Sequence, residues 1–200
     1  MILAKFKSLL WTDFFLYTIV DPRSLYRQIG KNDPKPFLLS FTVPAITSLA
    51  GILTQSLLSV QSSFFYTKIT YGWILVFIFD SFLIIISAAL MDMLAQLLGN
   101  KGNIREMISL INYSHLPRAF ILPIVYIFVI LQFAPVFMYV FFSTVLFIWS
   151  AFIAILGISE MHSLDTGKSL LIFIFPYLFT SVSFFFMIFL AVVSALSYLV

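Results

Sequence analysis

Two aspartates, Asp80 and Asp92, are the residues of this sequence most able to do chemistry, because each lies within a long apolar run. A carboxylate at the centre of a bilayer costs about 2.5–3.5 kcal/mol on insertion scales, and such residues mark proton and ion pathways. At 100° per residue the two side chains lie about 120° apart around a helix, so they do not form a stacked pair. One interpretation is a proton or cation relay. The other, which we favour because the runs carry few further polar groups, is a hydrogen bond between packed helices or a carboxylate at the membrane interface.

The remaining acids and histidines form no catalytic or metal-binding pattern. Glu160, His162 and Asp165 lie close together without a second His or any Cys nearby, which is not the spacing of a zinc site, so we expect no metal and no cofactor. His115 is interpreted as an interfacial hydrogen-bonding residue rather than a switch. The sequence has no cysteine, no His-Glu-x-x-His motif, no glycine-rich phosphate loop and no nucleophile elbow, and a non-enzymatic protein is expected.

The composition indicates an all-α integral membrane protein. The chain is 62% hydrophobic and 10% charged, and it contains 25 Phe. A soluble domain carries about 25% charged residues, so there is too little polar surface here to cover a globule in water. Scattered cations beside a membrane do not make the basic platform that nucleic-acid binding requires, and no nucleic-acid partner is expected.

Apolar runs of sufficient length define five expected transmembrane helices, since a span needs about 20 residues. Their approximate bounds are 38–61, 72–98, 116–132, 136–157 and 169–197. The uncharged run 119–159 is about twice as long as the bilayer requires, so it must turn back, and 132–135 is the expected position of that turn. A bend is expected at Pro123 in the third span.

Small and polar residues recur at three- and four-residue spacing along the first expected span. They are Ser40, Pro44, Ser48, Gly51, Gln55, Ser59 and Ser62, and a similar stripe in the fifth span is Pro176, Thr180, Ser183, Met187, Ala191 and Ser194. Small residues let helices approach closely in lipid, so both stripes are interpreted as packing seams. A polar conduit through Gln55 is the alternative for the first stripe.

Two further helices are expected to lie in the membrane interface. Residues 1–36 form an N-terminal cytoplasmic or interfacial segment, in which Lys5, Lys7 and Trp11 accompany an apolar face, whereas 37–200 form the five-span domain. A frayed leader is the alternative for the N-terminal helix. A short helix between spans 2 and 3 is expected to begin at the N-cap Asn103 and to end before Pro117.

The placement of basic residues predicts the orientation. Ten of the 11 Lys and Arg fall on one side of the expected topology, and Lys68 alone lies on the other. This bias places the N-terminus in the cytoplasm and the C-terminus outside. The three polar pieces, 1–36, 99–118 and 157–168, therefore share a cytoplasmic face that we expect to bind a protein partner or anionic lipid. The candidate binding residues are Asp92, Lys101, Arg105, Tyr113, His115, Pro117, Arg118, His162 and Lys168, and the polar intramembrane residues are Asp80 and Gln55.

Two runs of the sequence resemble the Yip-domain (YIP) family of multi-pass membrane proteins. They are LLGNKGNIREMISLINYSHLP and FIWSAFIAILGISEMHSLDTGKSLLIFIFPYLF, and the matching positions are Gly99, Gly102, Tyr113, Pro117, Trp149, His162, Lys168 and Pro176. The resemblance covers about residues 20–195, with Asn100 and Ser169 as departures where Gly and Ala are common. It implies five spans and a non-enzymatic role. With so short an N-terminal region the resemblance implies a prokaryotic-type member of the family. Such members are in some cases associated with ABC-type exporters.

The leading functional hypothesis is a membrane scaffold or accessory subunit of a larger transport or trafficking assembly. Its expected partners are membrane lipids and another membrane protein, such as an ABC-type transporter or a second copy of the chain. Its expected location is the prokaryotic cytoplasmic (inner) membrane. The alternative is a small transporter or lipid-handling subunit that uses Asp92 and Asp80 in a hydrated cavity.

Overall fold

The computed structural model describes residues 10–29, 34–58 and 71–197, and this part of the chain contains helices and turns but no strand. Five helical stretches are long and apolar enough to cross a membrane. They are Pro36–Leu58, Trp73–Leu97, Ile104–Ile130, Pro135–His162 and Thr166–Val192. The predicted all-α class and the five spans are therefore confirmed. Ser59, Ser62, Lys68 and residues 1–9, with Lys5 and Lys7, lie outside the described residues.

Three short helices, α2 (Leu10–Val20), α3 (Pro22–Ile29) and α4 (Pro34–Ser40), precede α5 (Thr42–Leu58), which forms most of the first span. Asp21 separates the first two, and its carboxylate accepts hydrogen bonds from the backbone N–H and the hydroxyl of Ser24. This is the N-cap arrangement that starts a helix at a proline. Leu25, Tyr26 and Ile29 of α3 are buried, so the N-terminal segment forms part of the core rather than only lying over it.

The middle of the chain forms a nearly continuous helical run after α7 (Trp73–Leu97). It comprises α8 (Ile104–Ser114), the 3-10 helix η3 (Leu116–Phe120) and α9 (Ile121–Ile130). The expected N-cap is present, because Asn103 Oδ1 accepts the backbone N–H of Glu106 at 3.4 Å. The break falls in η3, one turn before Pro123, because a proline offers no N–H to the carbonyl four residues earlier and its ring crowds that carbonyl.

The predicted short helix exists as α8, but its surroundings differ from the expectation. Every residue from Met107 to Ser114 is buried, and α8 packs against α7, α10 and α4. A helix with an apolar face would leave its other side to water. Here that other side carries Ser109 and Asn112, whose hydroxyl and side-chain N–H groups donate hydrogen bonds within the protein.

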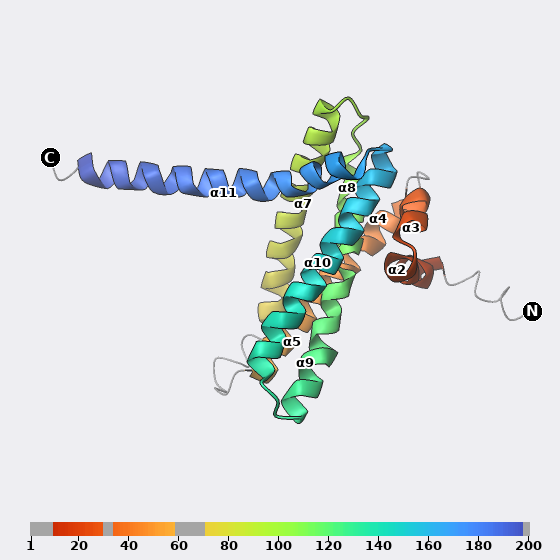
Figure 1. Cartoon of the computed structure of the whole chain (residues 1–200), viewed down its shortest axis with the longest axis vertical. Helices are drawn as coiled ribbons and strands as arrows, with labels where there is room; N and C mark the ends of the chain where they lie inside the picture. Colours follow the sequence, from red (N-terminus) through yellow and green to blue (C-terminus); the bar gives the residue numbers. More distant parts are fainter. Residues whose placement is uncertain (1–9, 30–33, 59–70, 198–200) are drawn as a thin grey trace, which may run out of the picture.

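The last two helices are α10 (Pro135–His162) and α11 (Thr166–Ser197). The turn before α10 lies where the sequence predicts it, with left-handed backbone at Gln132 (φ 52°) and Ala134 (φ 39°) and Pro135 in the first helical turn. Figure 1 shows α11 leaving the bundle sideways from the end where α10 finishes. The N-terminal part of α11 packs on α7 and α10, and Ile172 is fully buried there.

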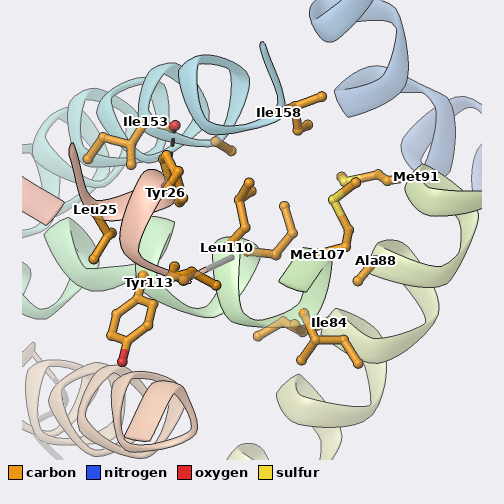
Figure 2. Close-up of a cluster of buried hydrophobic side chains, with 14 of the residues drawn as sticks. Leu25, Tyr26, Ile84, Ala88, Met91, Met107, Leu110, Tyr113, Ile153 and Ile158 are labelled. Atoms are coloured by element: carbon orange, nitrogen blue, oxygen red, sulfur yellow. Dashed lines mark hydrogen bonds between the residues drawn. The ribbon is translucent and has the colours of Figure 1, made fainter. Parts of the chain in front are cut away.

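The main core lies where α3, α7, α8 and α10 meet. Figure 2 shows Leu25 and Tyr26 beside Ile153, and Met107 and Leu110 between α10 and α7. The Tyr26 hydroxyl donates to the backbone carbonyl of Ile153 at 3.5 Å. In Figure 1 α3, α4, the loop after α7 and the loop after α10 lie toward the upper end and α2 lies about halfway along the bundle, whereas the turn before α10 and the end of α5 lie at the lower end.

Candidate functional site

Asp92 is buried and holds the turn between α7 and α8. Its Oδ1 accepts the backbone N–H of Asn103, and its Oδ2 accepts the side-chain amide of Gln96, both at 2.8 Å. Gly99 turns the chain at φ 88°, and the N–H of Asn100 returns to the carbonyl of Ala95. Hydrogen bonds to an ionised acceptor are about twice as strong as neutral ones, so this carboxylate fixes the start of α8.

Tyr113 and Asn112 join α8 to the beginning of the first span. The Tyr113 hydroxyl donates to the carbonyl of Pro36 at 3.0 Å, and its ring stacks on Phe14 with centroids 5.9 Å apart. The Asn112 side-chain amide donates to Ser40 Oγ at 2.9 Å. Both side chains are fully buried. Tyr113, which the sequence predicts as a binding residue, therefore holds α8 against α4.

The candidate cations at the upper end of the bundle are exposed. Lys101 lies in the loop after α7, Arg105 in the first turn of α8 and Lys168 in the first turn of α11. The Arg105 guanidinium lies 5.5 Å from the centroid of the Phe37 ring, within the range of a cation–π contact. His162 ends α10, and its Nε2 is buried with no hydrogen-bond partner among the described residues.

A cavity of about 780 Å³ lies between the spans, where α11 departs from the bundle. Its wall comes from α5, α7, the junction of α8 with η3, α10 and α11, and most of it is apolar. The polar groups that line it include Asp80, His115, Arg118 and Tyr177. Three candidate residues predicted from separate parts of the sequence, Asp80, His115 and Arg118, are thus brought together here.

The two charged side chains of the cavity do not neutralise each other by direct contact. Among the described residues neither Asp80 nor Arg118 forms an ion pair within 4.0 Å, although each is close enough to act electrostatically on the other. Asp80 Oδ2 accepts the Ser48 hydroxyl at 3.2 Å. The Arg118 guanidinium lies 5.4 Å from the centroid of the Phe147 ring, and its Nε is buried without a partner in the described structure.

The other predicted positions lie outside this cavity. Asp92 is hydrogen-bonded within the turn after α7, Pro117 is buried in the first turn of η3, and Gln55 is exposed on α5. In the first stripe Ser40, Pro44 and Ser48 are buried, as a packing seam requires. Sequence reasoning missed Tyr177 and Phe147, because an aromatic residue in an aromatic-rich span carries no signal of its own.

Comparison with known proteins gives one match. The family model described as the Yip1 domain matches residues 16–189, a range that includes the first four spans, most of the fifth and the whole cavity wall. No curated protein and no solved structure matches the chain.

Proposed function

The chain belongs to the Yip1 domain family, and from this premise we propose that it is a non-enzymatic scaffold or accessory subunit of a larger membrane assembly. Family membership and the five apolar helices make it an integral membrane protein. The finer parts of the proposal are the prokaryotic cytoplasmic membrane, the N-terminus in and C-terminus out, and a second membrane protein as partner. An ABC-type transporter or another copy of the chain would fit that role.

The observation that carries the proposal is the exposure of α11. Beyond Tyr177 its apolar side chains extend away from the bundle, and Phe185 and Met187 are 70% and 68% exposed. Ser183, Met187 and Ala191 share a helical face in this part. Lipid covers any apolar helix, but a face with small residues gains further from close contact with a second helix. A partner helix therefore suits this face better than lipid alone.

The exposed cations supply a second contact region at the upper end of the bundle. Lys101, Arg105 and Lys168 are exposed there, and Arg105 lies over the ring of Phe37 in α4. Charges of one sign at an interface accelerate association and favour partners of opposite charge. An acidic segment of a partner, or anionic lipid headgroups around it, would complement them.

Co-purification from native membranes in mild detergent tests the proposal. The full-length protein should retain a partner, whereas Ala191→Leu, which adds bulk on the small-residue face, should lose it. Val192→Leu on another face of α11 is the matched control and should retain the partner. A combined Lys101→Gln, Arg105→Gln and Lys168→Gln variant should weaken retention in a salt-dependent way. A protein that purifies alone, or whose partner is indifferent to all of these changes, contradicts the scaffold role.

The cavity favours a second candidate, a small transporter or lipid-handling subunit. Of the two acids proposed for that role, Asp80 lines the cavity and Asp92 is bonded within the turn after α7. The geometry therefore supports Asp80 as the working carboxylate of this candidate. Its function would require solvent or a headgroup to reach Asp80 from the cavity.

A further inference from the structure

The cavity between the spans carries two opposite charges with unused bonding capacity. A guanidinium has five N–H donors and a carboxylate about four acceptor positions. Arg118 Nε has no partner within the described residues, and the one hydrogen bond found there for the Asp80 side chain comes from Ser48. Both side chains are half-buried, and a charge partly removed from water without partners is costly, so a bound molecule that satisfies both groups would be stabilised.

The rest of the cavity wall suits a hydrocarbon chain. Leu83 and Ile84 of α7, Ile121 of α9, Phe147 of α10 and Phe184 of α11 line it. Its volume of about 780 Å³ lies within the roughly 300–1,000 Å³ of ordinary ligand sites. Ligand sites combine a mainly apolar wall with a few polar groups that fix orientation, and this cavity has both.

From this arrangement we propose that the cavity binds a phospholipid of the phosphatidylethanolamine class, with the phosphate on Arg118 and the ammonium on Asp80. Arginine binds phosphate oxygens with two parallel N–H donors, and an ammonium donates to a carboxylate. An anionic headgroup without an ammonium would satisfy Arg118 but leave Asp80 facing a like charge. A choline headgroup carries no N–H to donate to Asp80. The inference deepens the lipid-handling candidate by naming its ligand, and it does not depend on the scaffold role.

Native mass spectrometry of the full chain tests this site. The protein is reconstituted with equal amounts of phosphatidylethanolamine, phosphatidylcholine and phosphatidylglycerol, and retained lipid is counted, with inorganic phosphate added in a separate arm. Phosphatidylethanolamine should be retained in preference to the other two, and inorganic phosphate should not displace it. Asp80→Asn should lower the ratio of ethanolamine to choline lipid by about tenfold, the size expected for one charge-assisted hydrogen bond.

Matched variants separate the site from the fold and from the partner surface. Arg118→Gln should lose all three lipids, whereas Arg118→Lys should recover part of the binding because it keeps the charge. Asp13→Asn, on a residue outside the cavity wall, should leave the lipid ratio unchanged. Equal retention of the three lipids, preference for phosphatidylglycerol, displacement by phosphate, or an Asp80→Asn variant that keeps its ratio while folded would each overturn the proposal. An unaltered protein that purifies without any partner but keeps this lipid preference would overturn the scaffold role alone.

Discussion

Gly157 lies directly beneath the ring of Tyr26, at the crossing of α10 with α3. A methyl group at this position would overlap the Cε2 and Cζ atoms of that ring, which is itself buried. The Gly157→Ala variant should therefore lose about 1–3 kcal/mol of stability, the usual result of overfilling a packed core. Thermal unfolding in detergent measures the change. Gly51→Ala is the control, because nothing lies within 4 Å of the added methyl, and its unfolding temperature should not fall.

Burial also makes Tyr26 a source of pH dependence. Removal from water raises the pKa of its hydroxyl well above the ordinary value of about 10. Above that pH the unfolded chain releases the proton while the folded protein keeps it, so stability falls as pH rises, by about 1.4 kcal/mol per unit. Tyr26→Phe should show a shallower decline between pH 10 and 11 in the same unfolding assay, because the variant lacks the one proton that the unfolded chain releases at residue 26. Parallel curves for the two proteins would contradict the assignment.

The two intramembrane acids should respond differently to neutralisation. Asp92→Asn weakens the bonds to the Asn103 N–H and to Gln96, so it should lose about 1.5–3 kcal/mol of stability. Asp80→Asn should leave the fold largely intact and abolish any pH-dependent flux measured in liposomes. Loss of flux in a stably folded Asp92→Asn protein, with flux retained in Asp80→Asn, would reverse this assignment.

At this scale the sequence identifies both acids and their angular separation, but it does not distinguish their roles. The distinction depends on contacts across turns and between helices, such as Asp92 with the N–H of Asn103 and Asp80 with Ser48. Neither spacing nor composition encodes those distances. The sequence predicts Arg118 as a binding residue of the cytoplasmic face, and only the packing of η3 against α5 and α10 places it in the cavity wall with Asp80.

Helix α8 is the element whose identity was predictable and whose environment was not. The cap at Asn103 and the proline at 117 set its ends, and both are local features. Its burial on both sides depends on Ser40 and Pro36 at the start of the first span. These residues lie more than 70 positions earlier and accept hydrogen bonds from the side chains of Asn112 and Tyr113. The five spans, by contrast, follow from apolar length alone, and five helical stretches long and apolar enough to cross a membrane are present, the third of which begins at Ile104 with α8.

Tyr113→Phe tests how firmly α8 is tied to the first span. The change leaves the buried carbonyl of Pro36 without its donor at 3.0 Å, which should cost about 1–3 kcal/mol. Tyr126→Phe on α9 is the matched control, since that side chain is 52% exposed and its loss of a hydroxyl should be nearly neutral. Both are measured by thermal unfolding in the same detergent. Equal unfolding temperatures for the two variants would show that the bond from Tyr113 contributes nothing.

In the described part of the chain the polar pieces lie apart from the turn before α10. Helices α3 and α4 and the loops after α7 and α10 lie at the upper end with α2 about halfway down, whereas the turn at 131–134 lies at the lower end with Phe133 exposed. This arrangement agrees with the grouping that the basic residues predict, because those residues are concentrated in the same three pieces. The sideways course of α11 was not predictable, since its composition is that of an ordinary span.

Cysteine labelling across the membrane tests most directly whether the N-terminal helices and the loops after α7 and α10 share one side. The chain has no cysteine of its own, so Arg23→Cys, Lys101→Cys, Lys168→Cys and Phe133→Cys each place a single thiol at an exposed position. With a membrane-impermeant maleimide, the first three should be protected in intact cells and labelled after permeabilisation, whereas Phe133→Cys should be labelled in intact cells. Labelling of Arg23→Cys and Lys101→Cys from opposite sides would contradict the account.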